Sequence, residues 1–249
     1  MAAACALTGC SLLGNVSWNE AQINSAAEKA ITAMSITDDQ IVQLCSQSIA
    51  QLDKQATIET GTYLTRLNKL MKGVTVDGLT LNFKVYKTSE INAFASGDGS
   101  IRVYTGLMDV MTDDELMAII GHEIGHVVHQ DTKNAMKKAY MASAASDIIG
   151  AAGSVGALAQ SMVGSIAESF VNAQFSQKQE YAADDYGFQF AVKYGHSPYS
   201  MCSALQKLVN LSQGTQASAV AQMFSSHPDS AKRAERIKSK AETYVLSKK

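Results

Sequence analysis

Hydrophobic and polar residues follow a helical spacing over most of the chain and alternate only in a short central stretch. Residues 20–70 are predicted to be helical, because their large aliphatic side chains fall on one broad stripe. After a turn-rich segment at 73–78, residues 81–86 alternate apolar and polar positions, which is typical of a half-buried strand. Two further short strands are predicted at 91–95 and 101–105, joined by the turn sequence SGDGS.

Start signals mark the helices of the second half of the chain. Thr112 and Glu115 have the spacing of a capping box, and Met111 and Leu116 can form the hydrophobic staple beside it. The remaining helices are predicted at 168–194, at 198–212 and from Pro228 onward. The pattern therefore predicts an α+β fold that is mostly helical, with a small antiparallel sheet beside the helix that follows Thr112.

An uncharged run covers residues 148–167 and is long enough to span a bilayer. It consists mainly of Ala, Gly and Ser with few large aliphatic residues, so its transfer into a membrane is only weakly favoured. We favour a close-packed helical segment outside the membrane, with a membrane-associated hairpin as the alternative.

Charge argues against a nucleic-acid-binding protein. The chain of 249 residues has 21 Lys plus Arg and 23 Asp plus Glu, a formal net charge of -2, and therefore no general attraction to phosphates. Residues 231–249 are basic, but no aromatic side chains alternate with the charges to form a stacking platform. We interpret this tail as a solvated helix face.

The four cysteines, at positions 5, 10, 45 and 202, are too few for a disulfide scaffold and lack a CxxC zinc spacing. Cys45 and Cys202 could pair in an oxidising compartment. We favour the alternative that both are buried as small apolar side chains.

The strongest chemical signal is the sequence GHEIGH at 121–126. His122 and His126 are four residues apart, so both imidazoles lie on one helix face and can reach one ion, for which zinc is well suited. Glu123 is rotated away from direct ligation but can reach a water at the metal. A chance HExxH on a solvent-facing helix is the alternative, which the apolar flanks disfavour. The two glycines, Gly121 and Gly125, predict that another element approaches this helix closely.

A catalytic zinc needs a third protein ligand. Glu180, in the sequence QEYAADD on a second predicted helix, is the best candidate, although alone it would be interpreted as a surface carboxylate. Asp184 lies one turn later on the same face, where it could accept a hydrogen bond from a ligand histidine and fix the tautomer of that histidine.

Together, GHEIGH, EYAADDYG and HPDSAKR resemble the zinc metallopeptidase family that includes the CAAX prenyl endopeptidase and the bacterial heat-shock membrane protease, of gluzincin type. The resemblance extends from about Phe83 to Arg236 and is closest to the periplasmic lipoprotein branch. It implies a zincin-type catalytic core, one Zn²⁺ per chain held by His122, His126 and Glu180, and Glu123 as the general base.

The resemblance implies further roles. The strand residues Asn92, Ala93, Phe94 and Ala95 would bind an extended peptide substrate by backbone hydrogen bonds. His227 would lie near the metal and help to stabilise the oxyanion, and Arg233 would orient this part of the site. Alternatively, His227 only starts a helix and Arg233 forms a surface ion pair.

The N-terminal sequence LTGC, ending at Cys10, resembles the lipobox of bacterial lipoproteins, although the residues before it lack a basic segment and a long apolar core. This implies lipidation at Cys10, with 1–10 as a truncated signal, 11–19 as a tether and 20–249 as a single metallopeptidase domain. Ser11 would then indicate anchoring to the outer membrane on its periplasmic side. An ordinary frayed N-terminus is the alternative.

The sequence thus predicts a zinc-dependent endopeptidase of the bacterial envelope that acts on unfolded or misassembled proteins. Its partners would be extended protein or peptide substrates, the membrane through the lipid on Cys10, and other envelope proteins, but no nucleic acid. A chaperone-like binding module for outer-membrane proteins with latent protease activity is the alternative. A metal-dependent hydrolase with a non-peptide substrate is a third, weaker hypothesis.

Overall fold

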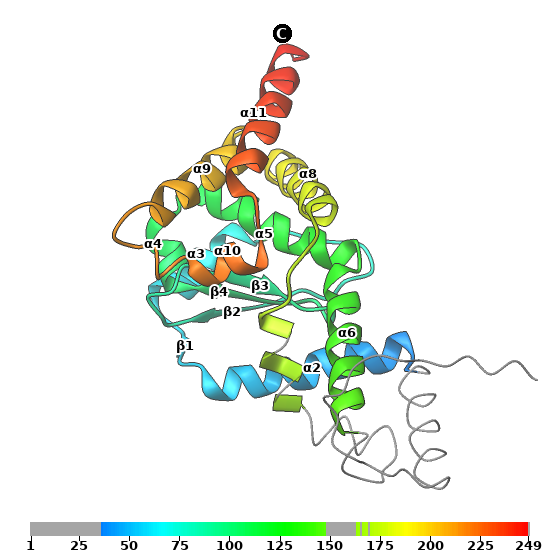
Figure 1. Ribbon diagram of the computed structural model, residues 1–249. Coiled ribbons are helices and arrows are strands. Elements are labelled where there is room, and N and C mark those ends of the chain that lie inside the picture. Colours follow the sequence, from blue (N-terminus) through cyan, green and yellow to red (C-terminus); the bar gives the residue numbers. More distant parts are fainter. Residues whose placement is uncertain (1–35, 148–162, 165, 169, 249) are drawn as a thin grey trace, which may run out of the picture.

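The computed structural model describes residues 36–147, 163–164, 166–168 and 170–248 of the chain (Figure 1). The elements of these residues follow one another in this order: α2 (Asp38–Gln55), β1 (Ile58–Glu59), α3 (Thr62–Leu70), β2 (Asn82–Tyr86), β3 (Ala93–Ala95), β4 (Ser100–Tyr104), α4 (Thr105–Val110), α5 (Asp113–Val128), α6 (Asp131–Asp147), α8 (Gln177–Lys193), α9 (Ser200–Ser212), α10 (Ala221–Ser226) and α11 (Ser230–Leu246).

The strands form a mixed sheet in the order β1-β2-β4-β3. β1 is antiparallel to β2 and β3 is antiparallel to β4, whereas β2 and β4 run parallel, with Val85 opposite Val103. The α+β class is confirmed, but the sheet is not wholly antiparallel as expected. The reason is that the chain crosses from β2 to the far edge, forms β3 there and returns as β4 into the space between them.

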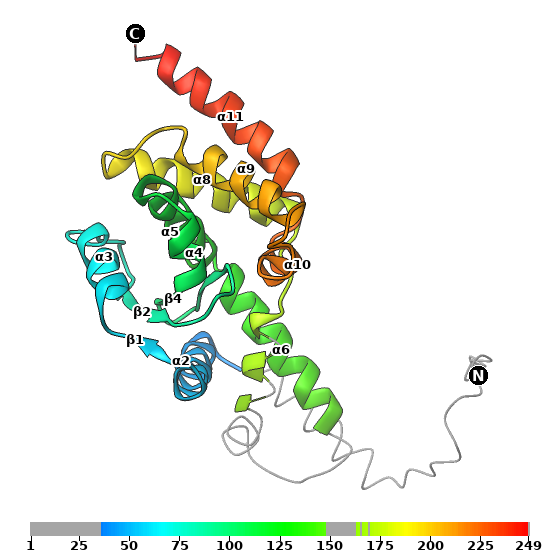
Figure 2. The same ribbon diagram turned by 90° about the vertical axis from the view of Figure 1, so that its left-hand side faces the viewer.

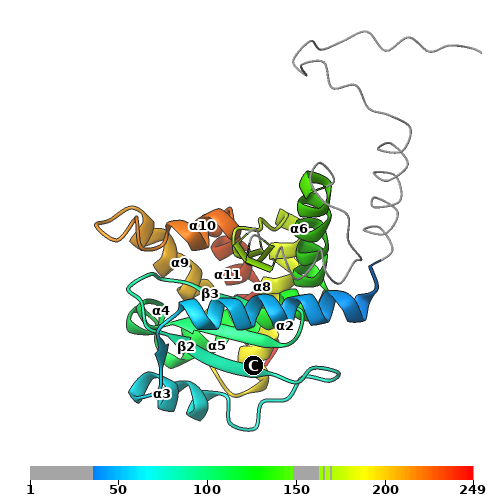
Figure 3. The same ribbon diagram turned by 90° about the horizontal axis from the view of Figure 1, so that it is seen from below.

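The sheet lies between α2 on one face and α5 on the other, and α8, α9 and α11 form further layers beyond α5 (Figure 1, Figure 3). Side chains alternate between the two faces along each strand. Val85 and Val103 belong to the large core shared with α5, whereas Tyr86, Phe94 and Tyr104 belong to a second core shared with α2 and α6. The fold therefore places α5 at the centre of the molecule.

A capping box starts α5 as predicted. The N–H of Thr112 donates to Glu115 Oε2 (2.9 Å), and the N–H of Glu115 donates to Thr112 Oγ1 (3.3 Å). In this way two backbone N–H groups at the start of the helix, which have no acceptor within the helix, are hydrogen-bonded. The capping box therefore fixes where α5 begins, and with it the position of the histidines that follow.

The close approach that the glycines of α5 predict is made by α8 (Figure 2). A Cβ atom at Gly121 would lie 2.8 Å from Phe190 Cβ, and one at Gly125 would lie 3.1 Å from the Ala183 Cα. From the other side, a Cβ at Gly187 of α8 would lie 2.7 Å from the carbonyl oxygen of Ala118. The glycines let the two helix backbones pack closely enough for their side chains to share one site.

Three predicted helix boundaries differ from the structure. The region 20–70 is interrupted, because Ala56 is extended and Ile58–Glu59 after it form β1. α8 begins only after Ser176, whose side chain caps it, rather than at 168. α11 begins after Asp229, which has a left-handed backbone (φ 61°), so Pro228 precedes the cap instead of occupying the first turn.

Both described cysteines are free, with Cys45 buried and Cys202 half-buried. Most of the uncharged run 148–167, the whole of the predicted tether and Cys10 lie outside the described residues. Among the residues that are described, none of the helices combines the length and the apolar character that crossing a bilayer requires.

Candidate metal centre

Three polar side chains of α5 point into one buried region. His122 and His126 lie one turn apart, with ring centroids 4.7 Å apart, and they are 2% and 0% exposed. Glu123 between them is also buried. Burying two imidazoles and a carboxylate costs free energy unless they find polar partners, and the partners come from α6, α8 and α11 and from the C-cap of α10.

The helix α8 contributes two carboxylates from successive turns. A capping box between Ser176 and Gln179 starts this helix, and Glu180 and Asp184 follow it on the inner face, each fully buried. Asp184 Oδ1 lies 3.0 Å from His122 Nδ1. Asp184, which the sequence suggested as the partner of a ligand histidine, therefore pairs with Nδ1 of His122. The other ring nitrogen, Nε2, faces Glu180.

Four donor atoms face one another, one each from His122, His126, Glu180 and His227, and all lie within 4.8 Å of each other. His122 Nε2 is 3.1 Å from His126 Nε2 and 3.3 Å from His227 Nδ1. Glu180 Oε1 is 3.3 Å from His126 Nε2 and 2.9 Å from His227 Nδ1. Ligands bound at about 2.05 Å in a tetrahedron lie roughly 3.3 Å apart, so these four separations, of 2.9 to 3.3 Å, are compatible with a tetrahedral metal site.

The donor set also fits a metal chemically. Glu180 Oε2 lies 2.5 Å from Arg233 Nη1, whereas Oε1 faces the nitrogens of His126 and His227. Burial lowers the pKa of His122, which favours the neutral imidazole that binds metals. For His126 burial acts in the same direction, but hydrogen bonds to Asp131 and Glu180 outweigh it and raise its pKa to about 9. A bound cation would displace that proton and satisfy all the inward-facing atoms together.

His227 lies at the C-terminal cap of α10, inside the metal group rather than beside it. Its Nδ1 faces Glu180, and its Nε2 is 3.7 Å from Glu123 Oε1. A cavity of about 10 Å³ adjoins Glu123 and His227 and is lined further by apolar side chains such as Met223. This volume suits about one water molecule, so the site is closed to anything larger in this arrangement.

Arg233 of α11 is buried and not a surface residue, which excludes the alternative of a surface ion pair. Its Nε and Nη2 lie 2.9 and 2.6 Å from the two oxygens of Asp184, and its Nη1 lies 2.5 Å from Glu180 Oε2. Two charge-assisted hydrogen bonds in a fork are the geometry that a guanidinium prefers. Arg233 thus neutralises both carboxylates of α8 and fixes their orientation.

Three contacts of this site involve residues that the sequence did not single out. Asp131 Oδ2 lies 2.9 Å from His126 Nδ1, and Gln179 Nε2 donates to Asp131 Oδ1 (2.7 Å). The ring of Phe175 stacks on His126, with centroids 4.0 Å apart. The only signals in the sequence were the spacing of Asp131 from the histidine motif and the position of Gln179 next to Glu180.

The predicted substrate strand is at the edge of the sheet. Asn92 O and Ser96 N form the hydrogen bonds to the neighbouring strand on either side of β3, so the backbone groups of Ala93 and Ala95 point away from β4. The residues Asn92 to Ala95 are all buried, however, and Phe94 lines a cavity of about 370 Å³ together with residues of α2 and of the segment 164–172. Among the described residues, β3 therefore pairs with β4 alone, and its residues are nevertheless shielded from solvent.

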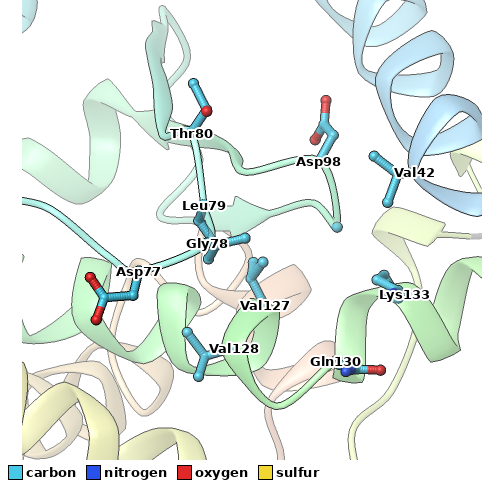
Figure 4. Close-up of a pocket in the computed structure, with 11 residues that line it drawn as sticks. Val42, Asp77, Gly78, Leu79, Thr80, Asp98, Val127, Val128, Gln130 and Lys133 are labelled. Carbon is cyan, nitrogen blue, oxygen red and sulfur yellow. The ribbon is translucent and has the colours of Figure 1, made fainter. Parts of the chain in front are cut away.

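A larger pocket, of about 400 Å³, lies away from the metal group. It is formed by the loop 77–80, the turn after β3 and the junction of α5 with α6 (Figure 4). Asp98, Lys133 and Gln130 are among its lining residues. None of the four metal-binding candidates lines this pocket.

Comparison with known proteins agrees with the geometry. The profile of "Peptidase family M48" matches residues 59–241. Metalloprotease LoiP of Escherichia coli (strain K12) is 40% identical over 96% of this chain and 93% of its own length, and Metalloprotease YcaL of the same organism is 36% identical over 93% and 91%. A Protease HtpX homolog of Pyrococcus abyssi is 29% identical over 59% of this chain and 63% of its own. The chain belongs to peptidase family M48 and is a metallopeptidase.

Proposed function

We propose that this chain is a zinc-dependent endopeptidase of the bacterial envelope that hydrolyses internal peptide bonds of unfolded or misassembled proteins. The observation that carries the proposal is the tetrahedral spacing of the inward-facing donors of His122, His126 and Glu180, with the free carboxylate of Glu123 next to them. Three nitrogen or oxygen donors with a carboxylate nearby are the arrangement of a catalytic zinc site.

The side chains divide the work of hydrolysis. His122, His126 and Glu180 would hold the zinc ion, which would supply a Lewis acid for polarising a carbonyl and acidifying water. Glu123 takes the proton from the attacking water and delivers it to the leaving amine. Among the described residues its nearest ion-pair partner, His227, is 3.7 Å away, so this buried carboxylate is free to do so. Asp184 and Arg233 hold His122 and Glu180 in place.

His227 has to move before a substrate can react. With its Nδ1 in the group, four protein atoms fill the corners of the tetrahedron, whereas a catalytic site keeps one position open. Once the ring has moved aside, its Nε2, which already faces Glu123, can donate to the developing oxyanion. The closed geometry therefore represents a resting form, and displacement of His227 opens the site.

The substrate would bind as an added strand on β3. The outward backbone groups of Ala93 and Ala95 offer hydrogen bonds to any extended chain, without regard to its side chains. An extended segment is available in unfolded or misassembled proteins and not in folded ones. The parts of the protein that shield β3 must move aside before a substrate can bind. Activity is therefore restricted to substrates that can displace them.

Anchoring to the outer membrane through a lipid on Cys10 is part of the proposal and rests on the sequence LTGC alone. Exchange of Cys10 for Ala should release the protein from the membrane fraction and abolish incorporation of labelled fatty acid. Release without any loss of fatty-acid label in the variant would contradict lipidation at this residue.

Hydrolysis is tested with purified protein and an unfolded substrate such as casein. We expect cleavage that stops on addition of a chelator and returns when zinc is restored, with one zinc per chain by elemental analysis. Cleavage that continues in the chelated, zinc-free protein would contradict the proposal. A metal-loaded protein that cleaves ester or amide model substrates but no polypeptide would favour a non-peptide hydrolase.

A further inference from the structure

The two nitrogens of His126 face opposite partners. Nε2 points into the metal group, 3.1 Å from His122 Nε2 and 3.3 Å from Glu180 Oε1, while Nδ1 lies 2.9 Å from Asp131 Oδ2. A carboxylate accepts hydrogen bonds and cannot donate them, and Asp131 Oδ2 at 2.9 Å is closer to the ring than Glu180 Oε1 at 3.3 Å, so Nδ1 is the nitrogen that keeps its proton when the ring is neutral. The lone pair of the neutral ring is then on Nε2, where a metal would bind.

The carboxylate of Asp131 is itself held by α8. Gln179 Nε2 donates to Asp131 Oδ1 (2.7 Å), and the Oε1 atom of the same amide accepts from the N–H (2.9 Å) and the hydroxyl (2.7 Å) of Ser176. Both ends of the Gln179 amide are therefore used, which fixes which end faces Asp131. Because Glu180 is the next residue, the same turn of α8 supplies one metal donor and orients another.

The backbone between α5 and α6 is bent so that Asp131 can reach back. Gln130 has φ 63°, one of two left-handed non-glycine residues in the described part of the chain, and it lies at the junction of the two helices (Figure 4). Such a conformation costs about 1–2 kcal/mol for a residue with a Cβ. Backbone strain of this kind persists where the surrounding structure requires it, and here the bend places Asp131 against His126.

We propose that Asp131 and Gln179 are positioning residues that set the tautomer and ring orientation of His126 across the interface of α5 and α8. The inference rests on the proposed function, since it takes His126 as a metal ligand. Asp184 lies in the corresponding place at His122, at 3.0 Å from its Nδ1. Each histidine of the motif thus has its own carboxylate, one from α8 and one from the start of α6.

A swap of the two polar groups tests the pair. Asp131→Asn puts one amide against another, and Gln179→Glu puts one carboxylate against another, so each single variant loses the match between donor and acceptor. The double variant restores it, because the Asn amide can donate to the Glu carboxylate and its oxygen can still accept from His126. Asp114→Asn is the matched control, since Asp114 pairs with a histidine away from the site, His196, at 2.7 Å.

The first readout is the dissociation constant for zinc, measured on the full chain by competition with a chelator of known affinity. We expect each single variant to bind zinc about 10–100-fold more weakly, the double variant to recover most of this loss, and the Asp114→Asn control to match the wild type. The second readout is the tautomer of His126 in the metal-free protein, from its ¹⁵N shifts at alkaline pH, where the ring is neutral. The proton should be on Nδ1 in the wild type and shared between both nitrogens in Asp131→Asn, because the Asn amide can donate to Nδ1 as well as accept from it.

The outcomes of these measurements distinguish a failure of the proposed metal centre from a failure of the positioning role. A wild type that binds no zinc would overturn the metal centre and this inference with it. A wild type that binds zinc, with single variants that bind it equally well and keep the proton on Nδ1, would overturn the positioning role alone. Equal losses in the single and double variants would also contradict the pairing of Asp131 with Gln179.

Discussion

Arg233 and Asp184 form a forked ion pair in the interior of the molecule, with Nε and Nη2 at 2.9 and 2.6 Å from the two carboxylate oxygens. Neither side chain is more than 2% exposed. The same guanidinium faces Glu180, so one cation compensates two buried anions. The architecture of the metal group depends on this arrangement, because an unpaired charge at such depth is costly.

Replacement of Arg233 by Ala should therefore lower the free energy of unfolding by about 3–5 kcal/mol, since Asp184 and Glu180 lose their cation. Lys should not restore it, because an ammonium cannot reproduce the fork. Denaturant unfolding of the metal-free protein measures the change. Arg236→Ala is the control: Arg236 pairs with Asp185 at 33% side-chain exposure, and it should cost less than about 1 kcal/mol. Equal losses of unfolding free energy in Arg233→Ala and Arg236→Ala would contradict the role of Arg233 as the cation that compensates Asp184 and Glu180.

Glu123→Gln should retain one zinc per chain but lose proteolysis by several orders of magnitude, since an amide cannot take the proton from water. Zinc content and casein cleavage are measured on the same preparation. Full turnover in the metal-loaded variant would refute Glu123 as the base. In cells the same variant distinguishes a protease function from a chaperone function. Complete rescue of a deletion strain by Glu123→Gln would favour the chaperone-like binding module.

His227→Ala should change the metal environment without emptying it. If His227 Nδ1 occupies the fourth corner, X-ray absorption of the zinc-loaded wild type should detect three imidazoles, and the variant should show two, with a water oxygen in place of the third. The other three donors suffice to keep one zinc per chain. An unchanged number of imidazoles in the variant would show that His227 is not a ligand at rest.

Asp53 should contribute to the dependence of stability on pH. Burial acts to raise its pKa, but hydrogen bonds from Arg102, Lys84 and Tyr86 outweigh this and lower it to about 2. The unfolded chain binds the proton near pH 4. The stabilisation is therefore complete above about pH 4 and is lost as the pH falls towards about 2.

The measurement compares the free energy of unfolding at pH 5 and pH 3 in the wild type and in Asp53→Asn. Other carboxylates destabilise both proteins at low pH, so the difference isolates Asp53. We expect the wild type to lose roughly 0.5–1 kcal/mol more than the variant, after discounting for solvent screening. A larger loss in the variant would contradict the assigned shift.

Local sequence signals predicted those parts of the site that lie on regular helices. The spacing of His122 and His126 and that of Glu180 and Asp184 placed each pair on one helix face, and the capping box at Thr112 fixed the start of α5. The contact of Asp131 with His126 was not predicted, because it depends on the left-handed backbone at Gln130, which cannot be inferred from helical periodicity. The parallel pairing of β2 with β4 escaped because strand order is set by tertiary packing.

The packing of α8 on α5 gives the last prediction. By helix propensity alone, Gly187→Ala should stabilise the protein by about 1 kcal/mol. A Cβ there would lie 2.7 Å from Ala118 O and 2.9 Å from His122 N, both backbone atoms that cannot move independently. We therefore expect a loss of about 1–3 kcal/mol in the free energy of unfolding.

The displaced helix should also weaken zinc binding, because His122 and Glu180 would no longer meet at their present separation. Gly164→Ala is the control, since Gly164 is also helical and its added Cβ would meet nothing within 4 Å. Thermal unfolding and zinc affinity of the two variants decide between helix propensity and packing. A Gly187→Ala protein that is as stable as the control and binds zinc as tightly would show that the two helices can separate without cost to the site.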